Sequence, residues 1–404
     1  MKNLPLASIS KTTLRSTTIV LAFAILFGTL AARSVQAQTL TVLYRFRGYS
    51  DIFPYAGLVR DSAGNLYGTT AGTACTAPTT AYGTVFKVDP SGTQTVLHTF
   101  NFSDGACPFA PLIRDAEGNL YGTTDQGGAF GYGTVFKLDP SGKETVLHSF
   151  NQGTADGYYP SAGLLRDEAG NLYGTTENGG ASEYGTVFKL DTSGIETILH
   201  NFAGADGEFP YSGLIMDANG NLYGTTPKGG IYQGVLYKLS KSGKFTLLHS
   251  FAGNGDGCYP GGTPFMDQKG NLYGTTGYCG ASGYGTVFKF DTSGKETVLH
   301  SFAGGTKDGA YPIAAGVLMD REGNLYGDTE MGGGTGCGGY GCGTVYKLNK
   351  KGTLILLHTF TVSEGEYPFG DLSLDPKGNS YGTASQGGRG CQGLGCGTVW
   401  KLTQ

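Results

Sequence analysis

The chain has 404 residues, a formal net charge of −4 and only 15% charged residues. This charge pattern offers no basic surface for a phosphate backbone, so we exclude nucleic acid as a partner. Gly is abundant at 71 residues, but no Gly-X-Y period accompanies it and Pro is ordinary. The chain is therefore neither collagen nor a flexible linker, and its glycines mark turns.

Residues 1–37 differ in composition from everything after them. Basic residues precede an apolar stretch at 19–32, and a small-residue cleavage site ends at Ala37. This pattern is typical of a secretory signal peptide. The apolar stretch is short for a spanning helix of about 20 residues, so we expect cleavage after Ala37 rather than a retained membrane anchor. No later segment is apolar enough to span a bilayer, and we expect a protein of the periplasm, the cell surface or the medium.

The mature chain begins with residues 39–46, an apolar run typical of a single β-strand. A repeat follows, marked by the sequence Gly-Asn-Leu-Tyr-Gly or a close variant of it. Its copies begin at Gly64, Gly118, Gly170, Gly220, Gly270, Gly323 and Gly378, at a spacing of 50 to 55 residues. A fixed period of this length indicates a repeat architecture.

Four short apolar runs travel together in each unit, as at 163–167, 171–176, 185–190 and 196–202. Turn sequences, Asp-Glu-Ala-Gly and Asp-Thr-Ser-Gly, separate the first two and the last two runs. We name these predicted strands A, B, C and D. Four antiparallel strands per unit, repeated seven times, predict an all-β, seven-bladed β-propeller. A β-solenoid is the competing repeat fold, but its coils are shorter and need no pairs of tight hairpins.

The two ends of the repeat region complement each other. The last unit ends with its C strand at 397–402, and no D strand follows. The run at 39–46 aligns with strand D and belongs to no unit after it. We therefore expect this N-terminal strand to complete the last blade and close the ring, which leaves no open sheet edge. Residues 38–404 then form a single domain.

The repeated pattern resembles a known family. The sequences Asp-x-x-Gly-Asn-Leu-Tyr-Gly-Thr-Thr, Gly-Thr-Val-Phe-Lys-Leu-Asp and Glu-Thr-Val-Leu-His-Ser-Phe, the last intact at 144–150, are similar to the GloVer tandem repeat of bacterial exported proteins. The resemblance covers almost all of the mature chain. It implies export and repeat architecture but no activity, because no activity is established for the family. Many members carry a sorting or anchoring segment at the C-terminus, and we expect this protein to depart from them by having none.

The two faces of the predicted ring differ in their loops. The A–B and C–D hairpins are tight and uniform, whereas the B–C and D–A connections vary. The B–C loops of the first, sixth and seventh blades are long, and these blades are neighbours across the ring closure. Variable loops on a rigid scaffold commonly carry binding sites, so we expect any site on the B–C and D–A face.

All eight cysteines fall in these variable connections. An even number in an exported chain favours disulfides. Position suggests the pairs Cys75 with Cys107, Cys258 with Cys279, Cys337 with Cys342, and Cys391 with Cys396. A metal site built from the two Cys-x4-Cys pairs is the alternative, although their spacing is wider than that of usual zinc knuckles.

Several titratable residues recur at one position of the repeat. The six histidines share one place in strand D, where Tyr44 takes the seventh place. We interpret them as one blade contact repeated and not as a catalytic ring. A carboxylate recurs in the D–A connections, at Asp51, Asp104, Asp156, Asp206, Asp256, Asp308 and Glu364. We expect these side chains to accept hydrogen bonds from local backbone N–H groups, with calcium binding as the alternative. No other cofactor is indicated.

Residues without a counterpart in other blades cluster near the ring closure. They are Arg47, Tyr49, Glu330, Tyr340, Gln386 and Arg389. With Asp51, one of the recurring carboxylates, they are the candidate binding residues in these loops. Tyr and Arg suit flat polar ligands such as glycans or peptides. No nucleophile elbow, metal motif or phosphate loop is present. We therefore predict a monomeric, non-enzymatic binding module for a glycan or protein ligand. A propeller hydrolase or lyase acting on a polysaccharide or lactone, and a purely structural surface protein, are the alternatives.

Overall fold

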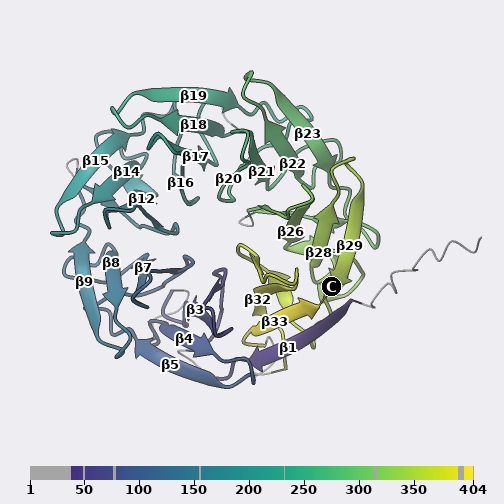
Figure 1. The fold of residues 1–404 in the computed structure, drawn as a ribbon, viewed down its shortest axis with the longest axis horizontal. Coiled ribbons are helices and arrows are strands. Elements are labelled where there is room, and N and C mark those ends of the chain that lie inside the picture. Colours follow the sequence, from purple (N-terminus) through teal and green to yellow (C-terminus); the bar gives the residue numbers. More distant parts are fainter. Residues whose placement is uncertain are drawn as a thin grey trace, which may run out of the picture. The chain divides into compact units, whose positions relative to one another are not determined.

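The structure is a computed structural model that describes residues 38–48, 51–75, 79–153, 156–231, 233–313, 316–389 and 395–403. The predicted signal peptide, Tyr49 and Cys391 lie outside these residues. The described chain forms seven antiparallel sheets of four main strands, arranged in a ring (Figure 1). This confirms the predicted seven-bladed propeller. Within the described part of the chain, no helix is long and apolar enough to cross a membrane.

The strands occur in the predicted order A to D in every blade. In blades 1 to 6, strand A is β2 (Val59–Arg60), β6 (Ile113–Arg114), β11 (Leu165–Arg166), β16 (Ile215–Met216), β20 (Phe265–Met266) and β25 (Leu318–Met319). Strand B is β3 (Leu66–Thr70), β7 (Leu120–Thr124), β12 (Leu172–Thr176), β17 (Leu222–Thr226), β21 (Leu272–Thr276) and β26 (Leu325–Thr329). Strand C is β4 (Thr84–Val88), β8 (Thr134–Leu138), β14 (Thr186–Leu190), β18 (Val235–Leu239), β22 (Thr286–Phe290) and β28 (Thr344–Leu348). Strand D is β5 (Gln94–Thr99), β9 (Glu144–Ser149), β15 (Glu196–Asn201), β19 (Phe245–Ser250), β23 (Glu296–Ser301) and β29 (Leu354–Thr359).

Blade 7 closes the ring as predicted. It combines β31 (Ser373–Leu374), β32 (Ser380–Gln386) and β33 (Thr398–Thr403) with β1 (Thr39–Arg45). Strand β1 pairs with β33 in antiparallel register from Thr39 opposite Thr403 to Arg45 opposite Thr398. The two ends of the described chain therefore lie side by side at the outer edge of this blade (Figure 1). The pairing satisfies the outer edge of β33, which would otherwise be open to another chain.

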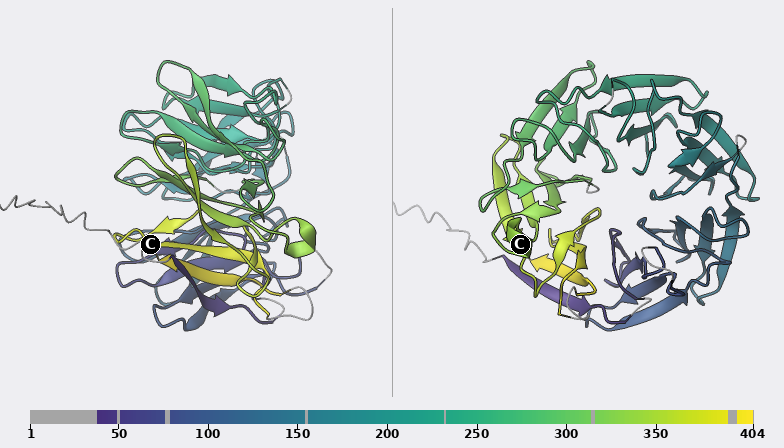
Figure 2. Two further views of the ribbon diagram at one scale, coloured as in Figure 1. Left: turned by 90° about the vertical axis from the view of Figure 1, so that its right-hand side faces the viewer. Right: turned by 180° about the vertical axis from the view of Figure 1, so that it is seen from behind.

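Short strand pairs join the D–A and B–C connections. They are β10 (Gly157–Tyr158) with β13 (Asn178–Gly179), β24 (Gly309–Ala310) with β27 (Met331–Gly332), and β30 (Glu366–Pro368) with the end of β32. Both kinds of connection thus lie on one face of the ring, as the sequence predicts. The 3-10 turn η1 (Cys337–Gly339), from the long B–C loop of blade 6, stands out on this face in the side view of Figure 2.

Neighbouring blades pack through one aromatic pair that is repeated seven times. The Phe after strand D of one blade meets the aromatic residue in strand C of the next, edge to face. The pairs are Phe46 with Phe86, Phe100 with Phe136, Phe150 with Phe188, Phe202 with Tyr237, Phe251 with Phe288, Phe302 with Tyr346, and Phe360 with Trp400, at 5.0 to 5.4 Å between ring centres. Such pairs contribute about 0.5–1.5 kcal/mol beyond their buried area. The glycine of strand B leaves room for the ring, since a Cβ on Gly68 would lie 2.7 Å from Phe86.

The repeated polar residues serve the scaffold. In the A–B turn, Asp167 accepts hydrogen bonds from the backbone N–H and the side-chain amide of Asn171 and from the hydroxyl of Tyr173. In strand D, Nε2 of each His lies 3.0 to 3.5 Å from the carboxylate in the following D–A connection. The same carboxylates accept backbone N–H groups, as Asp206 does from Ala203 at 2.7 Å. The turn interpretation therefore holds for Asp206, while Asp51 instead accepts from the side chains of Thr84 and Gln94.

Candidate ligand site on the propeller axis

Each D–A connection contains a residue in an unusual backbone conformation. The residue before the proline has a φ of 55° to 65° in all seven blades, at Phe53, Cys107, Tyr159, Phe209, Tyr259, Tyr311 and Tyr367. A left-handed conformation is unfavourable for bulky side chains, by about 1–3 kcal/mol, and persists only where the surroundings hold it. The D–A connections therefore hold the backbone atoms of this residue in a defined position.

Hydrogen bonds to two neighbouring blades hold this conformation. The N–H of Tyr159 donates to the carbonyl of Tyr132 in blade 2, and its own carbonyl accepts from the N–H of Glu177 in blade 3, both at 3.0 Å. Cys107 bridges Tyr82 and Asp125 in the same way. The connection thus couples adjacent blades and holds the backbone of the residue that follows strand B.

The residue that follows strand B bears a carboxyl group in three blades. Asp125, Glu177 and Glu330 each come directly after the second Thr of strand B, or its equivalent, in blades 2, 3 and 6. Glu330 is one of the candidates from the sequence, which predicts no counterpart for it in other blades. The register corrects this, because Asp125 and Glu177 occupy the same position. An alignment of the seven B strands extended by one residue would have found both.

The segments after the prolines converge on the propeller axis, where they line a cavity of about 560 Å³. All seven blades contribute to its wall. The aromatic lining residues are Tyr55, Phe109, Tyr211, Tyr259, Tyr278 and Phe369, and the acidic ones are Asp125, Glu177 and Asp371. A second cavity of about 370 Å³ shares Glu177, Tyr211 and Tyr259 with it. We call the larger space the axial cavity; its volume is within the range of small-molecule sites, about 300–1,000 Å³.

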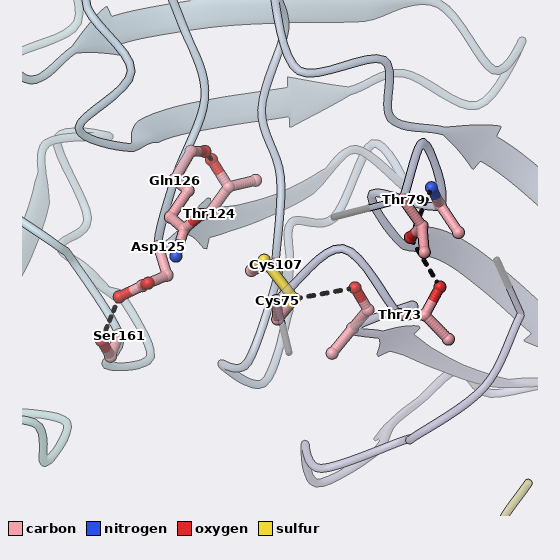
Figure 3. The surroundings of a disulfide bond; sticks show 10 residues. Thr73, Cys75, Thr79, Cys107, Thr124, Asp125, Gln126 and Ser161 are labelled. Carbon is pink, nitrogen blue, oxygen red and sulfur yellow. Dashed lines mark hydrogen bonds between the residues drawn. A yellow bond between two sulfur atoms is a disulfide. The ribbon is translucent and has the colours of Figure 1, made fainter. Parts of the chain in front are cut away.

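The carboxyl groups of the axial cavity are poorly solvated. Burial raises the pKa of Asp125, whose Oδ1 accepts a hydrogen bond from the hydroxyl of Ser161 at 2.8 Å (Figure 3). Burial and, to a smaller extent, the charge of Asp125 raise the pKa of Glu177 to about 7. Burial likewise raises the pKa of Asp371 to about 6, although its Oδ1 accepts the N–H of Gly316 at 2.7 Å. Glu177 and Asp371 therefore change charge near neutral pH.

Two groups of aromatic rings flank the carboxyls. Tyr55 contacts Phe109 and Phe369 edge to face, with ring centres 5.6 Å apart in both pairs. On the opposite blades, Tyr259 lies 6.0 Å from Tyr211 and 5.6 Å from Tyr278. The hydroxyl of Tyr211 is buried without a hydrogen-bond partner. The cavity thus combines flat apolar walls with polar groups that have capacity for a ligand.

A disulfide supports one side of the cavity. Cys75 in the B–C loop of blade 1 is bonded to Cys107 (Figure 3). The backbone carbonyl of Cys107 accepts a hydrogen bond from the N–H of Asp125. The predicted pairs Cys258 with Cys279 and Cys337 with Cys342 are also present. Cys396 is disulfide-bonded as well, and its predicted partner, Cys391, lies outside the described residues. The alternative metal site needs four thiolates from the two Cys-x4-Cys pairs, and it is wrong because Cys337 and Cys342 are joined as a disulfide.

The other loop candidates do not converge. Arg47 and Arg389 are exposed, Tyr340 is 70% exposed, and Gln386 pairs through its backbone with Glu366 at the end of β32. Among the described residues no hydrogen bond or ion pair joins these side chains. Glu330 differs from them, because it is half-buried and its charge raises the pKa of Tyr55 and Tyr278, secondary to their burial. Its charge thus acts on two of the tyrosines that line the axial cavity. Asp51 is held by Thr84 and Gln94, as described above.

One group of described side chains has donor atoms spaced for a metal ion. The ligand atoms of His148, Asp156 and Glu196 all lie within 4.8 Å of one another, between strand D of blades 2 and 3. Burial and the neighbouring Asp156 raise the pKa of Glu196 to about 9. The carboxyl group of Glu196 therefore keeps its proton at neutral pH. This cluster lies at the outer rim, away from the axial cavity.

Comparison with known proteins places the chain among repeat proteins. A family model described as the Gloeobacter/Verrucomicrobia repeat matches residues 25–233, 152–340 and 231–404. No curated protein matches. The chain is similar in structure to the extracellular domains of a one-component and a hybrid two-component system from B. thetaiotaomicron, with 12% and 13% identity and TM-scores of 0.56 and 0.58. The alignments cover 89% and 91% of this chain but only 39% and 40% of those chains.

A gluconolactonase from Xanthomonas campestris is more loosely similar. The two share 12% identity at a TM-score of 0.44, over 90% of this chain and 89% of the enzyme. At 12% and 13% identity, the likeness to the two extracellular domains shows a shared fold alone.

Proposed function

This chain belongs to the Gloeobacter/Verrucomicrobia repeat family, and we propose that it is an exported, non-enzymatic binding protein whose ligand occupies the axial cavity. Three intact disulfides and the likeness to extracellular propeller domains support export. The observation that carries the proposal is the cavity itself, in which all seven blades converge on aromatic walls and three carboxyl groups.

We propose a saccharide as the ligand. Aromatic faces pack against the apolar face of a sugar ring, and carboxyl groups accept hydrogen bonds from its hydroxyls. Seven separate connections position the lining, so the site is largely formed before binding, which lowers the entropy cost of association. This assigns the ligand to the axis and not to the exposed loops of blades 6, 7 and 1.

Two variants distinguish the axis from the loops. The axial variant combines Glu177→Gln with Tyr211→Ala, and the loop variant combines Tyr340→Ala with Arg389→Ala. Mature protein is screened on a glycan array, and affinities for the best saccharide are measured by calorimetry. We expect the axial variant to lose at least about tenfold in affinity, equivalent to about 1.4 kcal/mol, and the loop variant to bind as the wild type does. Loss in the loop variant alone would refute the axial site.

The second candidate function is a hydrolase or lyase that uses Asp125 and Glu177. Neighbouring carboxyls with raised pKa values are typical of acid–base catalysis, and here Glu177 keeps its proton to about pH 7. The enzyme would release products from an oligosaccharide or lactone that chromatography detects, and Glu177→Gln would abolish the release. Saccharide binding without any product favours the binding protein.

A further inference from the structure

The ionisable carboxyl groups that line the axial cavity have no positively charged side chain beside them in the described part of its lining. Asp125, Glu177 and Asp371 line it, and among the described lining residues there is no lysine or arginine. Uncompensated carboxylates are costly to bury, and a ligand that brings the opposite charge offsets that cost. The polar groups of the cavity therefore favour a cation over a neutral molecule of the same shape.

The aromatic side chains that line the axial cavity also favour a cation. Tyr211, Tyr259 and Tyr278 form a continuous group of rings beside Glu177 in this cavity, and Glu177 also lines the adjoining one. The face of an aromatic ring attracts an ammonium group, most strongly where water is excluded. The buried hydroxyl of Tyr211, which has no partner, can accept an N–H from such a group. Carboxylates, ring faces and a vacant acceptor thus converge on one side of the cavity.

We propose that the ligand carries an ammonium group, as an amino sugar does, and that this group binds between Asp125, Glu177 and the rings of Tyr211 and Tyr259. The inference rests on the proposed function and specifies its ligand. An ammonium group donates three hydrogen bonds, and those to ionised carboxylates are the strong ones. Acetylation removes both the charge and two of the donors, so the N-acetylated form of the same sugar should bind weakly.

Binding is coupled to the protonation of Glu177. Burial and Asp125 hold its pKa at about 7, and a bound cation favours the ionised form. The affinity for an amine therefore rises with pH between 5 and 7, by up to about tenfold per pH unit, and binding releases protons. The other charged or titratable residues that line these two cavities in the described chain are Asp125, Asp371, Tyr55, Tyr211, Tyr259, Tyr278 and Lys228. The ammonium of Lys228 lies 5.5 Å from the ring centre of Phe209 at the adjoining cavity.

The experiment compares the β-1,4-linked disaccharide of glucosamine with its di-N-acetylated form by calorimetry at pH 5, 6 and 7. At pH 7 we expect the amine to bind at least about tenfold more tightly than the acetylated sugar, since a hydrogen bond to a charged group is worth about a factor of ten or more. Glu177→Gln and Asp125→Asn should each remove most of this difference and flatten the pH dependence. Glu168→Gln, an exposed change in an A–B turn on the opposite face, is the matched control and should change nothing.

The outcomes separate this inference from the proposed function. Equal or tighter binding of the acetylated sugar overturns the inference and leaves the binding function standing. Tight amine binding that survives Glu177→Gln and Asp125→Asn also overturns it, because the amine then binds elsewhere. If neither disaccharide binds and the glycan array is silent, both the inference and the proposed function are wrong. Circular dichroism of each variant establishes that the propeller is folded.

Discussion

Glu196→Gln should stabilise the protein at neutral pH. Glu196 begins β15 and faces blade 2, with its Oε2 3.8 Å from Nε2 of His148, which lies 3.5 Å from Asp156. The Glu196 side chain is only 11% exposed, and its Oε1 is buried without a hydrogen-bond partner. Burial and the charge of Asp156 raise its pKa to about 9.

The sign and size of the effect follow from proton linkage. Above its ordinary pKa of 4.5 the carboxyl ionises in the unfolded chain, whereas the folded protein keeps the proton until about pH 9. The folded state therefore binds more protons in this window, and stability falls as pH rises. At about 1.4 kcal/mol per pH unit, the loss between pH 4.5 and 7 is about 3 kcal/mol. Gln removes this loss and can donate to Asp156, as Gln94 donates to Asp51 at 3.0 Å at the corresponding place in blade 1.

Thermal unfolding at pH 5 and pH 7, with EDTA present, measures the effect. We expect the variant to match the wild type within about 1 kcal/mol at pH 5 and to exceed it by about 3 kcal/mol at pH 7, or roughly 4 °C in Tm for a propeller of this size. Glu168→Gln, exposed in the same blade, should show no difference at either pH. A variant that is less stable than the wild type at pH 7, or equally shifted at both pH values, would refute the reasoning.

Three further changes test the scaffold. Asp328 is buried, and its Oδ1 has no hydrogen-bond partner. At the equivalent position of blade 2, the hydroxyl of Thr123 donates to the carbonyl of Ala162. Asp328→Thr should therefore raise the free energy of unfolding in urea by about 1–3 kcal/mol, and an unchanged unfolding midpoint would contradict this. Replacing Cys75 and Cys107 by Ser should lower the free energy of unfolding by about 4 kcal/mol, through loop-closure entropy, and should weaken binding in the axial cavity. The same change at Cys337 and Cys342 should lower it by about 2 kcal/mol and leave binding unchanged. Deleting residues 38–45 exposes the edge of β33, and light scattering should then show oligomers; a monodisperse monomer would argue against the closure.

The sequence alone was enough for the architecture. Each blade is a local pattern of four apolar runs and two tight turns, and its repetition identifies the strands without any long-range information. Even the closure by 39–46 followed from counting strands, because a missing D strand and an unassigned one have to pair. The disulfide pairs in the described residues followed from the loops in which the cysteines lie.

Only the tertiary structure located the candidate site. Asp125 and Glu177 lie 52 residues apart in ordinary loop sequence, and neither interrupts the repeat in a way that marks it. They meet because each is held beside the axial cavity by a backbone hydrogen bond to a D–A connection, Asp125 to Cys107 and Glu177 to Tyr159, at residues with positive φ. A propeller axis is thus assembled from single residues of separate blades, and no local pattern contains it. Sequence variation between the repeats indicates where the copies differ, and these positions are the exposed loops. It does not indicate how far a residue lies from the axis, because that distance depends on how the ring closes.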